Sequence, residues 1–294
     1  MTDTVVVTGG LGRSGRWLVD ALADDHRVVC VDRDHPGFDA EGRPGIEFRA
    51  ADLTDRGQAG DVVRDAEPDA VVHWAAIPHP LRHPEGRVFE NNVLAAYNVL
   101  TAAGRAGARI VQASSESTYG FPFAGERRLP EHAPVREDHP LRPEDPYGAS
   151  KVTAEEVAAT VARRDGVPAV SLRASWIQFP GDYVVTDMDP EAGADNLWGY
   201  VDVRDVVTAV EAALSADVDG HEPVNVTAAD TFLDRPTREA FRATHGGVPE
   251  PCDLGGTATA YDLRKAGDLL GWAPEHSWRD AAEEDVDGPD LLAD

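Results

Sequence analysis

The sequence predicts an α/β fold, with a doubly wound parallel sheet and a small lobe toward the carboxyl end of the chain. Two observations support this prediction. Short apolar runs of strand length alternate with amphipathic stretches of helix length from residue 4 to about residue 227. The apolar runs are also nearly continuous, which is typical of strands that are buried on both faces. Helices that cross over between parallel strands would cover both faces of such a sheet.

The individual elements follow from this pattern. The predicted strands are 4–9, 27–32, 46–52, 69–76, 108–115, 167–175 and 223–227. Helices are predicted at 13–25, 88–106 and 204–215, and another is predicted to begin near Pro146. Asp145 is a suitable N-cap for that helix, and proline fits its first turn because the missing N–H has no helical partner there.

The periodic pattern weakens after Arg173. Residues 176–196 contain turn formers and acids without a clear period, so we expect them to cross a cleft. The segment 197–203 returns toward the sheet. Two short helical segments near 236–244 and 262–270 are enough for a small lobe.

These segments divide the chain into a main domain and a lobe. The main domain is predicted to comprise residues 1–173, joined by roughly 199–227. The lobe is predicted to comprise 174–198 and 228–294, with a frayed acidic end. We expect the lobe to provide the substrate side of a site.

The charge of the chain is strongly one-sided. Its 294 residues include 53 acidic and 27 basic side chains, a formal net charge of −26. Such a polyanion repels nucleic acids and anionic membrane surfaces, so neither is expected as a partner. Only Lys151 and Lys265 are lysines. A spread acidic excess with arginine in place of lysine resembles halophilic proteins, for which molar salt shortens the Debye length to ~3 Å; a generically acidic protein is the alternative.

Cysteines, histidines and the apolar residues argue against a disulfide-stabilised, secreted, membrane-spanning or metal-binding protein. Cys30 and Cys252 provide no disulfide framework. The first residues lack the basic and long apolar regions of a signal peptide, and no 18 apolar residues run together, so a cytoplasmic protein without a membrane span is expected. His79 and His83 are four residues apart, but a proline follows each of them and interrupts any common helix. No metal is therefore predicted.

A glycine-rich turn joins the first predicted strand to the first helix. In TGGLGRSG (8–15), Gly9, Gly12 and Gly15 allow a tight turn and let a pyrophosphate approach the backbone at the helix amino terminus. The second strand ends in Asp32, 20 residues after Gly12, where a carboxylate would accept hydrogen bonds from an adenosine ribose. This context predicts a Rossmann dinucleotide site rather than a glycine-rich turn with an unrelated surface acid.

The same carboxylate favours NAD over NADP, because Asp32 would repel a 2′-phosphate. Arg33 follows directly and Arg13 lies in the glycine-rich turn, so a basic side chain could still accommodate that phosphate. The sequence is therefore compatible with either NAD or NADP as the cofactor, and it favours NAD.

Tyr147 and Lys151 are four residues apart on the helix that begins near Pro146, so they project from the same face. A free phenol has a pKa of ~10 and is a poor base at neutral pH. A nearby ammonium and the positive nicotinamide ring of oxidised cofactor would favour the phenolate and lower that pKa. Lysine can also bind the ribose as a compact charge on a flexible stem, unlike a planar guanidinium. This explains the retention of lysine at this position.

Further motifs surround these residues in a fixed order. They are VD at the end of the second strand, ADLTD (51–55), HWAA (73–76), NNV…NVL (91–100), SSESTYG (114–120), LRAS (172–175), YVDVRDV (200–206) and, near the carboxyl end, 263–280. Together with TGGLGRSG and YGASK, they resemble the extended short-chain dehydrogenase/reductase family, also called the NAD-dependent epimerase/dehydratase family. The resemblance extends from residue 4 to residue 206.

The resemblance implies roles for individual residues. Tyr147 would be the catalytic base, Lys151 its electrostatic partner, and Ser115 the hydroxyl that holds the reacting C–O group. The implied or predicted cofactor contacts are Gly9, Gly12, Arg13, Ser14, Gly15, Asp32, Arg33, Asp52, Leu53, Ala75, Ala76, Asn92, Tyr147 and Lys151. The substrate contacts are Ser115, Glu116, Ser117, Tyr147 and Arg173. An arginine paired with the acidic loop is the alternative role for Arg173.

Members of this family act on nucleotide sugars or on free sugars. A nucleotide-sugar enzyme must neutralise a diphosphate, yet residues 174–199 contain no arginine or lysine, and Trp198 stands where the family has an arginine. The sequence therefore favours NAD(P)-dependent oxidation of a free sugar at C1 to its lactone, as in aldose and uronate dehydrogenases. A nucleotide-sugar epimerase or reductase is the alternative, and a non-catalytic NAD(P)-binding sensor is a third. The sequence does not identify which sugar is the substrate. A homodimer is expected only because proteins of this family often form dimers.

Overall fold

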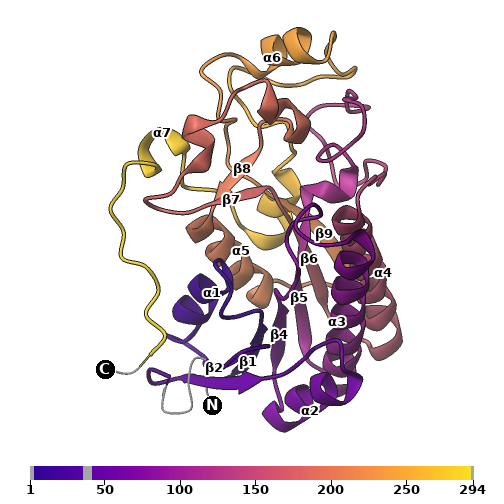
Figure 1. Ribbon diagram of the computed structural model, residues 1–294, viewed down its shortest axis with the longest axis vertical. Coiled ribbons are helices and arrows are strands. Elements are labelled where there is room, and N and C mark those ends of the chain that lie inside the picture. Colours follow the sequence, from indigo (N-terminus) through magenta and orange to yellow (C-terminus); the bar gives the residue numbers. More distant parts are fainter. Residues whose placement is uncertain (1–2, 36–41, 293–294) are drawn as a thin grey trace.

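The structure is a computed structural model and describes residues 3–35 and 42–292. Within those residues, seven parallel strands form the main sheet, in the order β3-β2-β1-β4-β5-β6-β9 (Figure 1). Their bounds are β1 (Thr4–Thr8), β2 (Arg27–Asp32), β3 (Ile46–Ala50), β4 (Ala70–His73), β5 (Arg109–Ser115), β6 (Ala169–Ala174) and β9 (His221–Val226). The strand order changes direction between β1 and β4, which confirms the predicted doubly wound sheet.

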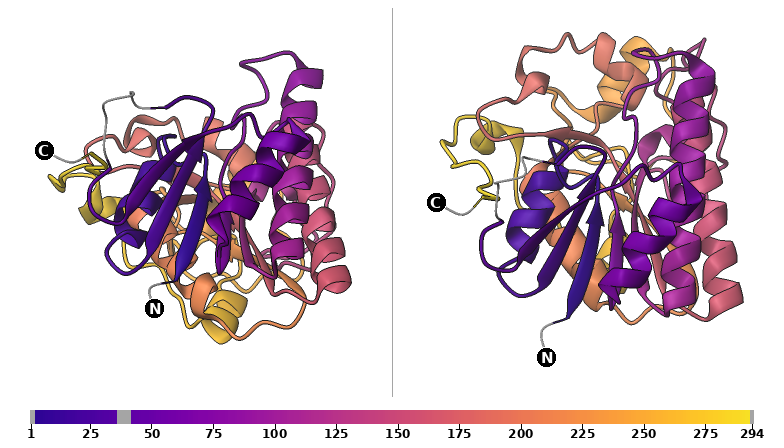
Figure 2. Two further views of the ribbon diagram at one scale, coloured as in Figure 1. Left: turned by 90° about the horizontal axis from the view of Figure 1, so that it is seen from below. Right: turned by 60° about the horizontal axis from the view of Figure 1, so that its bottom comes forward.

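Helices cover both faces of this sheet. They are α1 (Gly15–Leu22), α2 (Arg56–Ala66), α3 (Glu85–Ala106), α4 (Pro146–Asp165) and α5 (Val203–Ser215). Val5 and Val7 of β1 pack in one core with α1 and α5, whereas Val6 packs in a second core with α2, α3 and α4. Both faces of β1 are buried from solvent, which is why its sequence is continuously apolar. Figure 2 shows α3 and α4 lying side by side on their face of the sheet.

Helix α4 begins where the sequence predicts. The Asp145 carboxylate accepts hydrogen bonds from the backbone N–H groups of Tyr147 at 2.9 Å and Gly148 at 2.8 Å. Pro146 is the first helical residue, and Gly166, with a φ of 70°, follows the last one. Glycine adopts this left-handed conformation without the steric penalty of other residues. The cap fixes the turn of the helix that carries Tyr147.

The other elements are shorter. They are β7 (Trp176–Gln178), β8 (Tyr200–Asp202), α6 (Thr237–Thr244), α7 (Trp278–Ala281), η1 (Glu116–Tyr119), η2 (Val184–Asp187), η3 (Ala192–Asn196) and η4 (Ala266–Leu270). β7 and β8 pair in parallel as a separate two-stranded sheet, and Figure 1 shows them with α6 above the main sheet. Trp198 is fully buried in a third core, 5.3 Å between ring centres from Phe241. It therefore supports the elements above the sheet by packing.

Three elements differ from the sequence prediction. The sequence pattern does not predict α2, because only Ala59, Val63 and Ala66 of this helix are buried and its apolar stripe is short. The segment 176–196 is more ordered than expected, since β7, η2 and η3 lie in it. The helix predicted at 262–270 is confined to η4. No helix in the described part of the chain is long and apolar enough to cross a membrane.

Replacing Leu172 with alanine should measure the contribution of the sheet core to stability. Leu172 is fully buried in β6, so the substitution removes packed apolar surface and leaves a cavity. We expect a loss of about 2–5 kcal/mol in the free energy of unfolding, measured by urea titration. Leu81→Ala is the matched control because Leu81 is 78% exposed, and it should change that free energy by less than about 0.5 kcal/mol. Equal effects of the two substitutions would contradict the assigned core.

Candidate active site

A cleft of about 1000 Å³ opens at the carboxyl ends of the sheet strands. One wall comprises the ends of β1, β2, β4 and β5 with the start of α4, and the opposite wall comprises the segment from Ala174 to Asn196. Ligands of doubly wound sheets bind at this edge, where the strand order changes direction. Within residues 3–35 and 42–292, no three His, Cys, Asp or Glu side chains are grouped to hold a metal ion.

The glycine-rich turn after β1 lines one end of the cleft. Gly9 has a φ of 70°, and a Cβ there would lie 2.7 Å from the backbone of Ala75. A Cβ on Gly15 would lie 2.0 Å from the carbonyl oxygen of Gly9. Only glycine permits this close packing of strand, turn and helix, and the absence of side chains at the glycine positions lets a pyrophosphate approach the backbone there. Together with Gly12, which also lines the cleft, the turn fits the predicted dinucleotide.

Two other residues of the turn also line the cleft but are engaged by neighbouring side chains. Arg13 forms an ion pair with Asp182, and its guanidinium carbon lies 3.8 Å from the centre of the Phe179 ring. Ser14 Oγ accepts a hydrogen bond of 3.0 Å from Trp74 Nε1. The contacts of Arg13 tie the glycine-rich turn to the opposite wall.

Asp32 lies at the end of β2 and lines the cleft, where a ribose acceptor is predicted. Its carboxylate accepts hydrogen bonds from the N–H groups of Leu11 at 3.0 Å and Arg33 at 2.8 Å. These bonds fix the carboxylate and leave lone pairs available for a ligand. The Asp52 carboxylate accepts hydrogen bonds from Thr54, which lower its pKa. The same part of the cleft is lined by Arg33, Asp52, Leu53, Ala75 and Ala76.

Asn92 differs from its predicted role as a cofactor contact, because it is not among the described residues that line the cleft. Its Oδ1 accepts a hydrogen bond from the N–H of Ile77 at 2.8 Å, and its Nδ2 donates to the carbonyl of Ile77 at 3.1 Å. Nδ2 also donates to Ser150 Oγ of α4 at 3.2 Å. Asn92 therefore positions the loop after β4, which carries Ala75 and Ala76.

Ser115, Tyr147 and Lys151 come together on one wall of the cleft. Ser115 ends β5, and the other two residues lie in the first turns of α4. Tyr147 is hydrogen-bonded to Ser115, and Lys151 Nζ lies 5.5 Å from the centre of the Tyr147 ring. Nζ donates a hydrogen bond of 2.7 Å to the carbonyl of Ala113. The three residues with implied catalytic roles are thus neighbours.

Burial, rather than the charge of Lys151, dominates the pKa of Tyr147 in this structure. Burial raises that pKa to about 12; the hydrogen bond with Ser115 lowers it, and the charges of Asp145 and Glu116 raise it further. Burial also lowers the pKa of Lys151 to about 8, and the charge of Glu155 opposes this shift. Lys151 alone therefore does not produce the predicted phenolate. The positive ring of an oxidised dinucleotide would have to add to its effect.

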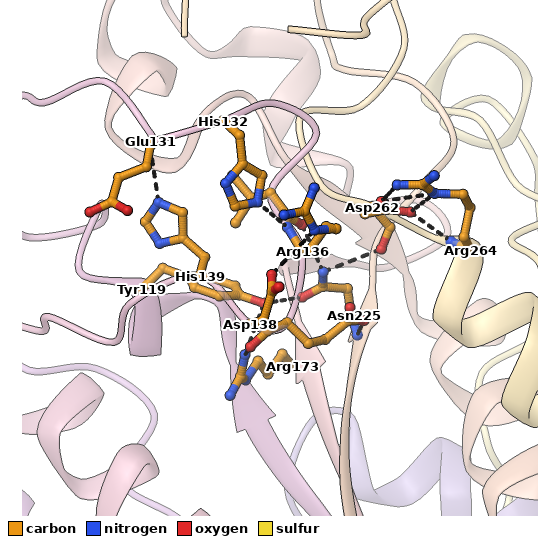
Figure 3. A network of polar contacts seen from close by, with 12 residues as sticks. Tyr119, Glu131, His132, Arg136, Asp138, His139, Arg173, Asn225, Asp262 and Arg264 are labelled. Atoms are coloured by element: carbon orange, nitrogen blue, oxygen red, sulfur yellow. Dashed lines mark hydrogen bonds and ion pairs between the residues drawn. The ribbon is translucent and has the colours of Figure 1, made fainter. Parts of the chain in front are cut away.

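Arg173 is predicted to contact the substrate, but it does not line the cleft. The described residues of the cleft wall do not include it. Its guanidinium donates to both carboxylate oxygens of Glu155 in α4, at 2.9 and 2.7 Å, and to the Tyr119 hydroxyl at 3.0 Å. Figure 3 shows Arg173 below Tyr119 and Asn225, in a polar network that continues to Asp262. The predicted substrate contact is corrected to a buried ion pair, because β6 directs this side chain toward α4.

Glu116 and Ser117, two further predicted substrate contacts, line the cleft from η1. Burial raises the pKa of Glu116 to about 8, and hydrogen bonding from Ser175, Tyr261 and Asn196 offsets part of the rise. The Ser117 N–H donates to Ser115 Oγ at 3.1 Å. The start of η1 thus holds the hydroxyl of Ser115 in place.

Most of the opposite wall could not be predicted. Its side chains include Trp176, Ile177, Phe179, Met188 and Asn196, all from the segment without a clear period. Without periodicity a sequence gives no face from which to infer side-chain direction. Phe123 lines the cleft from another loop and has a φ of 60°, a conformation that bulky residues rarely adopt. The only available signal was that aromatic residues cluster near turn formers in both segments.

Gly15→Ala should weaken dinucleotide binding. The added methyl group would lie 2.0 Å from the carbonyl oxygen of Gly9, so the turn must shift away from its pyrophosphate-binding shape. We expect the Kd for NAD, measured by quenching of tryptophan fluorescence, to rise by about tenfold or more. Gly60→Ala is the control, because a Cβ there meets nothing within 4 Å; it should leave the Kd unchanged. An unaltered Kd in Gly15→Ala would refute the assigned site.

Lys151→Met should change the pH dependence of stability. The pKa of Lys151 is about 8 in the folded protein and ~10.4 in an unfolded chain, so the unfolded state binds more protons between these values. Wild-type stability should therefore rise with pH across this window, on the order of 3 kcal/mol relative to the methionine variant. Urea unfolding of both proteins at pH 7 and pH 10 measures this difference. A difference that does not change with pH would show that the ammonium is not buried.

Comparison with known proteins agrees with the fold. Residues 5–183 match the family model described as NAD dependent epimerase/dehydratase family. A UDP-glucose 4-epimerase of Lactobacillus helveticus is 26% identical over 92% of this chain and 92% of that protein. An L-arabinose 1-dehydrogenase (NAD(P)(+)) of Haloferax volcanii is 32% identical over 64% of this chain and 72% of that protein.

A solved structure extends the likeness to nearly the whole chain. The glucuronic acid dehydrogenase of Chromohalobacter salexigens superposes with a TM-score of 0.70 at 23% identity, covering 99% of this chain and 92% of that one. At this identity the likeness shows a common fold. Because the family model spans more than half of the sequence and the fold agrees with it, the chain belongs to the NAD dependent epimerase/dehydratase family.

Proposed function

We propose that the protein oxidises a free sugar at C1 to the lactone, with NAD or NADP as the oxidant. The observation that carries this proposal is the charge of the cleft wall that faces Ser115, Tyr147 and Lys151. Residues 174–199, which supply most of that wall, contain five acids and no arginine or lysine. Proteins hold a diphosphate with arginine forks or other cations, so a nucleotide sugar would be poorly bound there. A free sugar needs no such cations.

The catalytic groups suit removal of a proton from a sugar hydroxyl. As a phenolate, Tyr147 would take the proton of the C1 hydroxyl, and Ser115 would hold the same oxygen by a hydrogen bond. Lys151 keeps a positive charge 5.5 Å from the phenol ring, which favours the phenolate. When bound, the oxidised dinucleotide supplies the acceptor for the hydrogen and the electron pair that leave C1. Loss of the proton and of this hydrogen with its electron pair leaves the lactone.

The cofactor would be held by the glycine-rich turn and by Asp32. NAD is favoured, because Asp32 would repel the 2′-phosphate of NADP. If NADP binds, Arg33 is a candidate cation for the phosphate: among the residues that the structure describes, its guanidinium donates to Asn91 Oδ1 at 3.3 Å, whereas Arg13 is ion-paired with Asp182. The name of the Haloferax dehydrogenase includes both dinucleotides, which supports dual use.

A nucleotide-sugar epimerase is the second candidate function. The observation that favours it is the match to the Lactobacillus UDP-glucose 4-epimerase over 92% of the chain. The cation-free wall counts against this alternative. The match to the Haloferax L-arabinose 1-dehydrogenase, over a smaller share of the chain but at higher identity, supports the dehydrogenase.

We further propose a role for the lobe and a dependence of activity on salt. The lobe at 174–198 and 228–294 would form the substrate side of the cleft. The net charge of −26 would require molar salt for full activity, because salt screens the repulsion between acidic side chains.

The proposal is tested with the purified protein in molar salt, given NAD or NADP and, separately, free aldoses, uronates and UDP-sugars. We expect reduced dinucleotide, followed by its absorbance, only with free sugars, and a lactone product identified by mass spectrometry. Conversion of UDP-sugars alone, without net reduction, would support the epimerase instead. Tight dinucleotide binding without turnover would support a sensor.

Tyr147→Phe should lower kcat by about 10²–10⁴ in the same assay, because the variant lacks the base. The Kd for NAD should change little, which separates loss of chemistry from loss of folding. Tyr97→Phe is the matched control, because the Tyr97 side chain is exposed on α3, away from the cleft. A Tyr147→Phe variant with wild-type kcat would remove the basis of the proposed mechanism.

A further inference from the structure

We infer that residues 121–128, here called the clamp segment, close the end of the cleft that lies away from the dinucleotide, and that Phe123 limits the substrate to a single sugar ring. The inference rests on the proposed oxidation of a free sugar and narrows its substrate class to monosaccharides. Disaccharides with a free C1 would be excluded.

Two consecutive arginines tie the clamp segment to both walls of the cleft. Arg127 donates hydrogen bonds to the Asp195 carboxylate at 2.5 Å and to the Glu191 carbonyl at 2.6 Å, and it forms an ion pair with the Glu191 carboxylate. Both acids belong to the opposite wall. Arg128 donates to the Glu144 carboxylate at 2.9 Å, and Glu144 lies just before the start of α4 on the first wall. The clamp segment therefore connects the two walls.

The ends of the clamp segment are fixed by packing. Phe121 is 5% exposed and belongs to the third core, with its ring centre 6.3 Å from that of Tyr119. Leu129, which follows the segment, packs against the same core. A Cβ on Gly120, which precedes the segment, would lie 1.9 Å from the carbonyl oxygen of Arg142, so glycine is needed for this close approach. Packing at both ends and ion pairs at both walls therefore hold the segment in place.

The clamp segment presents Phe123 to the cleft. This residue lines the cleft and has a φ of 60°, a left-handed conformation that strains a bulky side chain and persists only where the surrounding structure enforces it. Glycine would adopt the same conformation without strain. An aromatic residue at a position that favours glycine indicates that the ring itself has a role in the cleft.

The Phe123 ring packs against His79, which lines the cleft from the loop after β4. The ring centres are 5.4 Å apart in an edge-to-face arrangement, which is favourable for aromatic pairs. His79 Nδ1 accepts a hydrogen bond of 3.1 Å from the Leu81 N–H, which fixes the imidazole. Burial and the charge of Arg82 lower the pKa of His79, so the ring is neutral at pH 7. The charge of Asp145 opposes this shift, which indicates that the pair lies near the start of α4.

The position of this ring pair restricts the length of a substrate. A sugar with C1 beside Tyr147 has the dinucleotide on one side, because the glycine-rich turn lines that end of the cleft. The clamp segment, tied to the opposite wall and to the start of α4, lies on the other side. A second ring joined to the far side of the sugar would clash with Phe123 and His79, and such a clash discriminates between substrates that share the same reacting group. A single ring fits without displacing the pair.

Pairs of free sugars with the same reducing ring provide the test. The aldose that the wild type oxidises fastest is compared with the disaccharide that carries a second ring at its C4 hydroxyl, such as D-glucose with cellobiose or D-xylose with xylobiose. The wild-type kcat/KM for the monosaccharide, measured by the absorbance of reduced dinucleotide, should exceed that for the disaccharide by about a hundredfold or more. If no free sugar is oxidised, the proposed function fails and the inference with it. If disaccharides are oxidised as well as monosaccharides, only the inference fails.

Variants locate the discrimination. Phe123→Ala removes the ring, and Phe123→Gly also suits the left-handed backbone, so both should raise the kcat/KM for the disaccharide by about tenfold or more and change that for the monosaccharide less. Arg127→Met, which frees the clamp segment from the opposite wall, should act in the same direction. Phe89→Ala is the matched control, because Phe89 is 40% exposed like Phe123 but lies on α3, outside the described cleft wall. The Kd for NAD shows whether each variant is folded. Undiminished exclusion of disaccharides in the Phe123 variants or in Arg127→Met would overturn the inference.

Discussion

The buried ammonium of Lys151 is the interaction on which the rest of the site depends. It is 5% exposed and donates a hydrogen bond to the carbonyl of Ala113. A charge in this position needs a counter-charge nearby, and Glu155, one turn further along α4, supplies it. The Glu155 carboxylate is fixed in turn by Ser114 Oγ at 2.5 Å and by the guanidinium of Arg173. Arg173 thus supports Lys151 from below the cleft.

The sheet brings these groups together from distant parts of the sequence. Ser114 of β5 and Arg173 of β6 are register neighbours, so both side chains reach Glu155 on the helix that covers these strands. The next residue of β5, Ser115, then meets Tyr147, whose helix turn is fixed by the Asp145 cap. Strand register and one helix cap therefore determine the geometry of the wall that carries Ser115, Tyr147 and Lys151. The opposite wall depends on packing around the buried Trp198 instead.

This division explains how far the sequence could predict the structure. Continuous apolar runs, glycine punctuation and i, i+4 spacing are local signals, so the sheet, the dinucleotide turn and the Tyr147–Lys151 pair followed from them. Arg173 and Asn92 could not be placed, because the partners of a buried polar residue come from elements far away in sequence. The contribution of burial to the Tyr147 pKa could not be predicted either: burial raises that pKa in the protein without a ligand, and the predicted lowering beside a bound dinucleotide stays a prediction. The burial of Tyr147 depends on how the two walls of the cleft assemble, so it could not be predicted from the local sequence.

We expect Tyr147 to stay protonated in this pocket until the positively charged nicotinamide ring of an oxidised dinucleotide lies beside it. The most direct measurement is an ultraviolet difference titration of wild type against Tyr147→Phe, with and without oxidised dinucleotide. Without dinucleotide, the phenol should titrate near a pKa of about 12, and binding should lower that pKa toward neutrality. The same high pKa in both states would contradict the account, because Tyr147 could then not act as the base.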